Sequence, residues 1–330
     1  MEIFKGLIGN EDIKSTLGAS IKNSEFLHAY IIEGPYGTGK RTVARLASAS
    51  IMCKHRHMGM PCGECDTCKK ILNDNCADVR FYDAFKIDEI RKIKESIYES
   101  STECEYKVYI LNDAQKMNVK AQNALLISLE EPPKNVVFFL LCTDASVLLE
   151  TIRSRAQIVR TKPLSKDVIL DYVMRNSMTR LSKEALEEII ISSNGSLGYT
   201  LDMLDEEKSK ALSKDRERAL SLVTSLLSQS SSTYATLSSM FQMTREKLKE
   251  LFSLSLVVLR DLAVSKKSKN PPLCFFTSYE EADGIASKYS PKKILALYST
   301  IERAIDDINT NASVPCTMAS IITDFKRKGF

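Results

Sequence analysis

The sequence predicts an α/β protein with a parallel sheet, followed by a region made only of helices. From residue 28 to about 160, short apolar runs alternate with longer stretches in which apolar residues recur at helical spacing. Strands that alternate with helices favour parallel pairing in a three-layer α/β arrangement. Beyond residues 162–164 only helical spacing remains. A chain of 330 residues exceeds what one core usually supports, so we expect two or three domains.

Four strands are expected in the first part of the chain, at 28–34, 79–82, 107–111 and 135–142. The last is the clearest, because Val136 to Cys142 is an unbroken apolar run, as in a strand covered on both faces. Helices are expected between the strands, at 39–52, 86–100 and 118–131. The third helix ends at Glu130–Pro133, because proline lacks an amide donor and disfavours helical geometry in the residue before it.

The remainder of the chain is predicted to be helical throughout. Three short helices are expected at 165–176, 182–193 and 196–205, and Asn194-Gly195 is a stop signal after the second. Longer amphipathic helices follow, with breaks at 228–233 and 265–272. We therefore expect the last part of the chain to form a separate all-helical domain.

Composition and charge exclude several classes of protein. Hydrophobic residues make up 44% of the chain and charged residues 27%, with 12 Gly and 9 Pro, which are globular proportions. The longest apolar run is far shorter than the ~20 residues that a membrane-spanning helix needs, and the acidic start does not resemble a secretory signal. The balance of 46 basic and 42 acidic residues is too even to predict DNA binding from charge. We expect a cytoplasmic protein with no membrane segment.

A glycine-rich loop follows the first predicted strand. Residues 34–40 read Gly-Pro-Tyr-Gly-Thr-Gly-Lys and open the next helix, which is the context of a phosphate-binding P-loop. In such a loop the backbone amides and the helix N-terminus cradle an anion, and the lysine reaches the outer phosphates. The residues expected to form this loop are Gly34, Gly37, Gly39 and Lys40.

Two features that ATP hydrolysis needs are altered in this chain. A P-loop carries Ser or Thr directly after its lysine to bind magnesium, whereas this chain has Arg41, with Thr42 one position later. An acidic pair is expected at the end of a following strand, where this chain has Asn112 and Asp113. Because both changes affect one metal site, we expect no self-sufficient ATPase activity. The binding of ATP itself stays open.

Four of the nine cysteines fall within sixteen residues, which favours a metal site over disulfides. Two overlapping Cys-x-x-Cys steps place four thiolates within reach of one tetrahedral zinc ion, and the expected ligands are Cys53, Cys62, Cys65 and Cys68. One alternative is a loop of four reduced cysteines, and another is a site in which His55 or His57 replaces a cysteine. A closed four-sulfur site is structural, so we assign it to folding or docking and not to catalysis.

The order of these motifs resembles one known family. The P-loop, the four-cysteine insert after its helix, the Glu-Glu-Pro-Pro turn and the segment 151–159 are arranged as in the bacterial clamp-loader AAA+ proteins of DNA polymerase III. Within that family the chain is most similar to the delta-prime subunits. The resemblance covers residues 5–205, and the helical region after them matches only in length and character.

The resemblance implies three domains. Residues 1–163 would form an α/β P-loop domain of the RecA-like AAA+ type, with a zinc module at 53–76. Residues 164–208 would form a three-helix lid, and residues 209–330 an all-α collar that assembles with other subunits.

The resemblance also implies roles for individual residues. Ser154-Arg155-Ala156 corresponds to the Ser-Arg-Cys motif of the family, so Arg155 would be an arginine finger offered in trans to ATP on a neighbour. Without the family, Arg155 is an ordinary surface arginine. Thr143 occupies the place of the family's first sensor, and Gly195 to Gly198 lacks the arginine that senses the γ-phosphate in the family's ATPase subunits.

The function implied is that of a delta-prime-like stator. Such a subunit has a degenerate ATP site, joins other clamp-loader subunits in a hetero-oligomeric ring, and presents its arginine finger to an adjacent ATP. The ring acts on the sliding clamp and on primer-template DNA, so that the clamp is loaded during replication.

Two other functions stay open from the residues. One is a catalytically active ATPase subunit of the gamma/tau type, in which Thr42 serves magnesium and Asp113 is the base. The other is a zinc-dependent DNA-binding protein that uses two basic tracts, formed by Lys266, Lys267 and Lys269 and by Lys326, Arg327 and Lys328.

Overall fold

The computed structural model describes residues 7–83, 85, 87–176, 178, 181–228, 238, 240–268, 273–276, 278–309 and 313–327. The chain divides into two compact units. The first unit comprises Met1–Arg175 with Gly195–Tyr199, and the second comprises Asn176–Asn194 with Thr200–Phe330.

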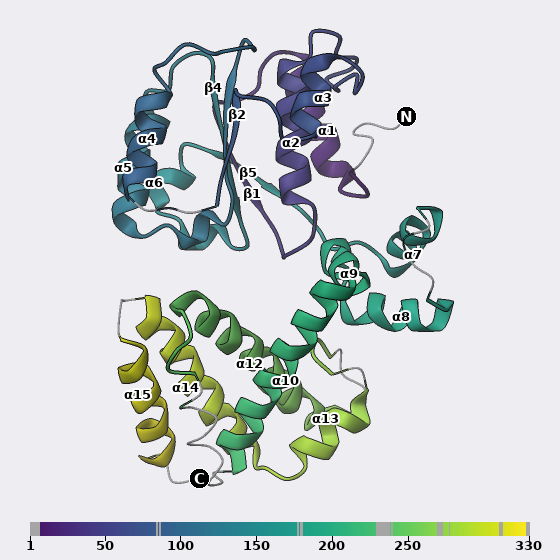
Figure 1. The fold of residues 1–330 in the computed structure, drawn as a ribbon, viewed down its shortest axis with the longest axis vertical. Helices are drawn as coiled ribbons and strands as arrows, with labels where there is room; N and C mark the ends of the chain where they lie inside the picture. The colour runs from purple at the N-terminus through teal and green to yellow at the C-terminus, as the bar shows by residue number, and fades with distance from the viewer. Residues whose placement is uncertain are drawn as a thin grey trace. The chain divides into compact units, whose positions relative to one another are not determined.

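The first unit contains a five-stranded parallel sheet (Figure 1). Its strands are β1 (Ala29–Glu33), β2 (Val79–Tyr82), β3 (Lys107–Leu111), β4 (Val136–Cys142) and β5 (Gln157–Arg160). Their order in the sheet is β2-β3-β4-β1-β5, and each neighbouring pair is parallel. The predicted α/β class with a parallel sheet is therefore confirmed. The sequence did not predict β5, because its four residues begin and end with polar side chains.

Helices cover both faces of this sheet (Figure 1). On one face lie α1 (Glu11–Lys22), α2 (Lys40–Met52) and α3 (Asp66–Leu72), and on the other lie α4 (Ile87–Ser96), α5 (Val119–Glu130) and α6 (Glu150–Arg153). Two short 3-10 helices, η1 (Ala114–Lys116) and η2 (Ala145–Val147), follow β3 and β4.

The strands supply a separate core to each layer of helices. Successive side chains of a strand point to opposite faces of the sheet. Ile32 and Phe139 therefore belong to the core beneath α1 to α3, whereas Ile31 and Phe138 belong to the core beneath α4 to α6. This double burial explains why the seven residues of β4 are all apolar and all buried.

Three short helices follow the sheet, as predicted. They are α7 (Lys166–Arg175), α8 (Lys183–Ser192) and α9 (Leu197–Leu204). Ser182 caps α8 by accepting a hydrogen bond from the Ala185 amide. The stop after α8 is formed by Asn194 and Gly195, whose φ angles of 49° and 80° lie in the left-handed region. The start of α9 belongs to the first unit, where it contacts the P-loop.

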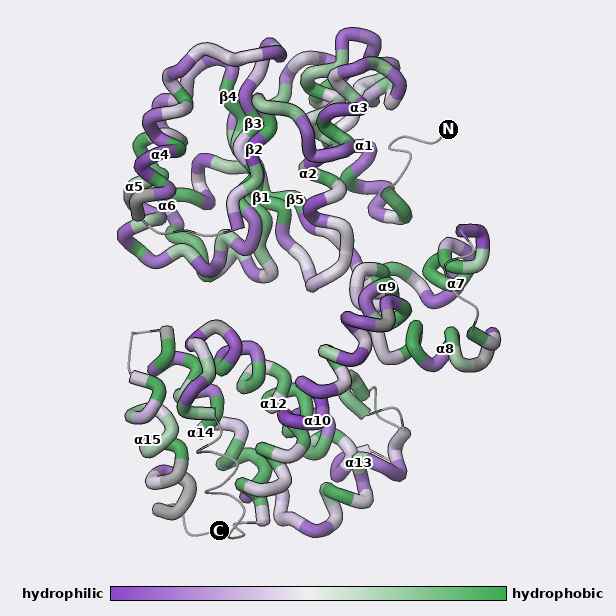
Figure 2. The backbone as a smooth tube through the Cα atoms, in the orientation of Figure 1, coloured by the Kyte–Doolittle hydropathy of each residue, from purple (hydrophilic) through white to green (hydrophobic). Residues whose placement is uncertain are grey.

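The described part of the second unit is helical. Its long elements are α10 (Glu206–Ser228), α12 (Arg245–Ser265), α13 (Tyr279–Ala286), α14 (Pro291–Asn309) and α15 (Val314–Arg327). Hydrophobic and hydrophilic residues alternate along these helices (Figure 2), and the apolar positions form one core that includes Leu222, Phe252 and Leu297. The fully buried Asp261 accepts hydrogen bonds from the amides of Cys274 and Phe275, at 2.8 and 2.6 Å. It thereby holds this segment against α12.

Parts of two sequence predictions lie outside the described residues. Lys266 and Lys267 directly follow α12, but Lys269 and Lys328 are not described, and neither are the side chains of Lys326 and Arg327. The predicted break at 228–233 is likewise outside the described residues after Ser228. Within the described parts of the chain, every helix is too short or too polar to span a bilayer.

Candidate functional site

The carboxyl edge of the sheet collects the residues expected to contact a nucleotide. Because β1, β3 and β4 are parallel and lie side by side, the residues that follow them meet at one edge. Gly34 follows β1 and donates its amide to the carbonyl of Cys142, the last residue of β4, at 3.1 Å. Thr143 follows β4, and the Asn112-Asp113 pair follows β3. The predicted nucleotide-binding residues therefore converge on one edge of the sheet.

The P-loop glycines allow an unusual backbone and a close approach to α9. Gly37 and Gly39 have φ angles of 70° and 90°, in the region that side chains other than glycine rarely adopt. A Cβ on Gly37 would collide with the Ser196 hydroxyl and lie 3.0 Å from the Cα of Gly198. The Gly198 amide donates to the Gly37 carbonyl at 2.9 Å. The first turn of α9 thus closes directly over the loop.

A pair of threonines, not found by the sequence analysis, also fixes the loop. The hydroxyls of Thr38 and Thr161 lie 2.7 Å apart, and both side chains are buried. The Thr38 hydroxyl lies 2.8 Å from the Pro35 carbonyl, which accepts its hydrogen bond. A Cβ on Gly34 would collide with the Thr161 hydroxyl. The first glycine is therefore required by packing against the residue that follows β5.

Lys40 is turned back onto its own loop. Its Nζ donates to the carbonyls of Gly34 and Pro35, at 2.7 and 2.8 Å. Burial lowers the pKa of Lys40 from its ordinary value, and the nearby Asp113 and Cys142 partly oppose that shift. The ammonium group that a P-loop aims at phosphate is held here by backbone oxygens.

Arg41 points away from the loop as well. Its guanidinium lies over the ring of Phe81 on β2, 4.4 Å from the ring centroid, and 3.6 Å from the carboxylate of Asp74. Asp74 also pairs with Arg45, one turn further along α2, at 2.7 Å. Thr42 lies half-buried in the first turn of α2. The residue at the usual magnesium position is thus engaged in a contact between α2 and β2.

The acidic segment after β3 is satisfied by neighbours on the protein. The Asn112 side-chain amide donates to Asp83 at 2.9 Å. The Asp113 carboxylate pairs with Lys116 at 2.8 Å and accepts a hydrogen bond from the Gln115 amide at 3.3 Å. The other end of the Gln115 side chain accepts from the Thr143 amide at 3.3 Å. Gln115 therefore ties Asp113 to Thr143, a link that sequence spacing did not predict.

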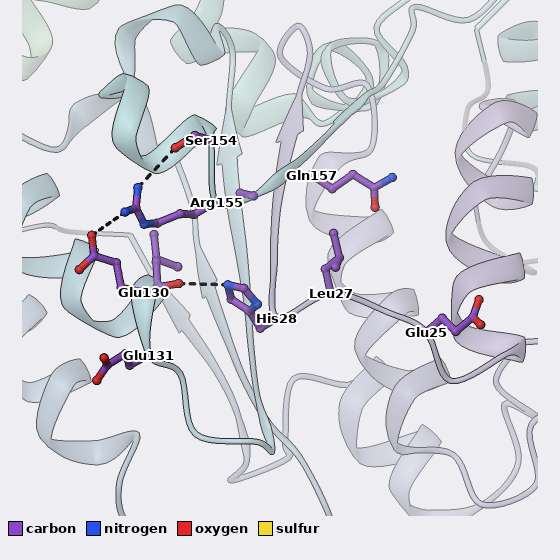
Figure 3. A pocket seen from close by; sticks show the side chains of 10 residues that line it. Glu25, Leu27, His28, Glu130, Glu131, Ser154, Arg155 and Gln157 are labelled. Atoms are coloured by element: carbon purple, nitrogen blue, oxygen red, sulfur yellow. Dashed lines mark hydrogen bonds and ion pairs between the residues drawn. The ribbon is translucent and has the colours of Figure 1, made fainter.

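Arg155 lies at the opposite, amino edge of the sheet. It precedes β5 by two residues and lines an open pocket of about 1010 Å³, together with Glu25, His28, Glu130, Glu131 and Ser154. Figure 3 shows its guanidinium between Glu130 and Ser154. The ion pair with Glu130 measures 2.8 Å, and 35% of the Arg155 side chain stays exposed.

The strand β5 separates Arg155 from the P-loop of the same chain. Its four residues correspond to about 13 Å of extended chain. Thr161, at the far end of β5, is the residue that packs against Gly34. Arg155 and the P-loop therefore lie at opposite ends of β5.

The four clustered cysteines converge beyond the end of α2. Cys53 is the C-cap of α2 and Cys65 is the N-cap of α3, so the end of α2 and the start of α3 both lie at the cluster. All four Sγ atoms lie within 4.8 Å of one another, and those of Cys62 and Cys68 are 3.9 Å apart. Within the described residues, this group contains no histidine.

The cluster has the donor set and geometry of a metal site. A tetrahedral site with metal–sulfur bonds near 2.3 Å requires sulfur atoms roughly 3.8 Å apart, close to the separation observed. The amides of Cys62, Cys65 and Cys68 each donate to a cluster sulfur at 3.4 Å. Hydrogen bonds from the backbone amides of Cys65 and Glu64 lower the pKa of Cys62 to about 6, whereas burial raises the pKa values of Cys53 and Cys68. The residues present therefore fit a bound metal ion.

Comparison with known proteins relates this fold and these sites to one family. The family model described as "DNA polymerase III, delta subunit" matches residues 9–165. DNA polymerase III subunit tau of Bacillus subtilis is 32% identical over 209 residues, covering 62% of this chain and 37% of that protein. DNA polymerase III subunit gamma of Buchnera aphidicola subsp. Schizaphis graminum is 32% identical over 208 residues, covering 61% of this chain and 57% of that protein. Over this part of the chain, the sequence is similar to that of DNA polymerase III subunits.

That relationship confirms the family resemblance seen in the sequence. The clamp-loader match at 9–165 contains the P-loop, the cysteine cluster and Arg155. The chain spans 37% and 57% of the length of the two curated relatives. A solved gamma-subunit-related protein of DNA polymerase III from Thermotoga maritima aligns with 95% of this chain and 99% of its own, at 20% identity and a TM-score of 0.46.

Proposed function

We propose that the chain is a delta-prime-like subunit of a DNA polymerase III clamp loader, a stator that offers Arg155 to ATP bound on a neighbouring subunit. The observation that carries this proposal is the position of Arg155. Its guanidinium is partly exposed at the amino edge and is separated by β5 from the P-loop of its own chain. An added cation is among the largest single contributions to phosphoryl transfer.

The state of the carboxyl edge supports the stator over the motor. Lys40 is bound to loop carbonyls, Arg41 to Asp74 and Phe81, and Asp113 to Lys116. A motor subunit would need all three positions directed at nucleotide and magnesium. We propose that ATP hydrolysis belongs to the neighbours of this chain.

The proposed partners follow from the same role. Other clamp-loader subunits would complete a hetero-oligomeric ring, and the ring would act on the sliding clamp and on primer-template DNA in the cytoplasm. We assign residues 1–163 to the RecA-like AAA+ domain that carries the finger, 164–208 to the lid and 209–330 to the collar. The helical core of the second unit is suited to a collar, although any helical bundle needs such a core.

We propose zinc as the ion of the cysteine cluster and a structural role for it. Four thiolates in a tetrahedral arrangement select zinc among the common divalent ions. Cys53, Cys62, Cys65 and Cys68 would all be ligands, which leaves no open position for a reacting water. The module at 53–76 would then be held to α2 and α3 by the ion.

An ATPase subunit of the gamma/tau type is the second candidate. The observation in its favour is that the two curated relatives described above are named tau and gamma subunits. Thr42 would then have to serve magnesium and Asp113 the attacking water. In the structure, however, Asp113 is paired with Lys116.

Magnesium-dependent ATP turnover distinguishes the two candidates. We would measure it for the purified chain alone, and for the chain mixed with the ATPase subunits of the same loader. The stator predicts no turnover alone and a stimulation of the mixture that is lost with Arg155→Ala. Robust turnover by the isolated chain would instead establish the motor.

A further inference from the structure

We propose that Glu130 is a positioning residue for the arginine finger, and this inference rests on the proposed function. Glu130 is the last residue of α5, and its carboxylate contacts the Arg155 guanidinium at 2.8 Å. The ion pair would hold the guanidinium at the amino edge in the orientation in which a neighbour's phosphate meets it.

Three contacts fix the plane of the Arg155 guanidinium. Nη2 pairs with Glu130, while Nη1 donates to the Thr151 carbonyl at 2.9 Å and to the Ser154 hydroxyl at 3.4 Å. Only Glu130 comes from outside the local turn, so it anchors the finger to a different element, α5. A guanidinium has five N–H donors, and these contacts use three of them. Donors therefore remain for a phosphate while Glu130 still holds the group.

The place of Glu130 on its helix is an independent reason to assign it this role. The carboxyl end of a helix carries a partial negative charge, so a glutamate there is unfavourable. Glu130 ends α5, and no basic residue lies in its last turn. Arg155 supplies the compensating charge from another part of the chain. The arrangement is costly for α5 alone and is explained by what it does for Arg155.

The other carboxylates of the pocket do not share this contact. Glu131 and Glu25 also line it (Figure 3), and within the described residues neither forms an ion pair with Arg155. Glu131 follows Glu130 directly and is similarly placed at the end of α5. It is therefore a matched control, because it has the same charge, helix end and pocket but does not touch the finger.

The test is ATP turnover by the loader's ATPase subunits, titrated with this chain carrying substitutions at Glu130. Glu130→Ala should lower the maximal stimulated rate about tenfold, because a finger misplaced by about 1 Å loses much of its effect. The concentration giving half of the stimulation should stay unchanged. Glu130→Gln keeps an oxygen acceptor and should retain the rate within about twofold, and Glu131→Ala should match the unsubstituted chain.

Glu130→Asp and a double variant distinguish a failure of the positioning role from a failure of the proposed function. Glu130→Asp keeps the charge but withdraws the carboxylate by one methylene, so an intermediate rate is expected even where Glu130→Ala folds poorly. Glu130→Ala combined with Arg155→Ala should be no slower than Arg155→Ala alone. If Arg155→Ala abolishes stimulation while the Glu130 variants behave like the unsubstituted chain, the positioning role is wrong. If Arg155→Ala itself has no effect, the proposed function fails.

Discussion

The two edges of one sheet differ in how their charged groups are used. At the carboxyl edge, Lys40, Arg41 and Asp113 are all bound by partners on the same chain. At the amino edge, Arg155 is held by Glu130, Thr151 and Ser154, and it also lines an open pocket. We propose that the carboxyl edge has lost its nucleotide chemistry, while Arg155 at the amino edge is available to another molecule. The following predictions test this contrast.

The largest effect is expected at the finger itself. Arg155→Lys keeps the positive charge but removes the planar fork that contacts two oxygens at once. We expect stimulated ATP turnover to fall on the order of 10³-fold, close to the loss of the whole finger. Lys134→Ala removes an exposed cation near the same edge and should change the rate by less than about twofold. Equal effects of the two substitutions would show that general charge, and not the finger, is responsible.

The next largest effect is expected when a cysteine of the cluster is replaced. The cluster and the P-loop lie at opposite ends of one helix. α2 begins at the P-loop and ends at Cys53. Cys68→Ser should remove the proposed zinc ion and lower the free energy of unfolding by about 3 kcal/mol, since structural metal binding contributes directly to folding. Urea unfolding and zinc content by atomic absorption measure both quantities. Cys316→Ser, an exposed cysteine outside the cluster, should leave both unchanged.

A smaller effect is expected at Asp78, which supports the amino edge. Asp78 is buried directly before β2, and it accepts hydrogen bonds from the amides of Thr102, Glu103 and Cys104 at 2.7 to 2.8 Å. Burial alone would raise the pKa of Asp78, but these amides outweigh it, so the pKa lies below its ordinary value. The stabilisation is therefore present at neutral pH and is lost as the pH falls through the lowered pKa.

We expect Asp78→Asn to cost about 2 kcal/mol of unfolding free energy at pH 7. Because the native carboxylate becomes protonated in acid, the difference from the unsubstituted chain should shrink below about pH 4. Urea unfolding at several pH values measures this. The exposed Glu95→Gln on α4 should show neither effect. A cost at Asp78 that stays constant across this pH range would contradict the proposed charge dependence.

The smallest effect is expected at the carboxyl edge. If nucleotide chemistry there has been lost, Lys40→Ala should leave stimulated ATP turnover within about twofold of the unsubstituted chain, even though the loop loses two hydrogen bonds. Titration of the ATPase subunits with the folded variant measures this. A loss of tenfold or more would mean that the loop of this chain takes part in turnover, and the contrast between the edges would disappear.

Local patterns in the sequence predicted much of this arrangement. The α/β class, four of the strands and the meeting of residues at the carboxyl edge follow from periodicity and parallel topology. The cysteine cluster was predictable because its four ligands lie close together in the chain. The family resemblance was also visible from motif order. These features all depend on short-range spacing or on a simple rule of topology.

Long-range partners could not be predicted in this way. Arg41 turns to Asp74 and Phe81, which are 33 and 40 positions away, and Glu130 meets Arg155 only because α5 and α6 pack on the same face. Strand β5 was missed because a short edge strand with polar ends has no distinctive pattern. Such contacts depend on tertiary packing, so local sequence propensity does not predict them.

Packing alone requires glycine at two positions of the P-loop. A side chain at Gly34 or Gly37 would collide with Thr161 or with Ser196 and Gly198, whether or not a phosphate ever enters the loop. Folding alone is therefore enough to keep these glycines in place. Arg41, the residue after the lysine, contacts Phe81 and Asp74 instead. P-loop glycines can therefore be retained in a protein that has lost its nucleotide chemistry. The residue that follows the lysine is a more informative sign of whether the magnesium site is kept.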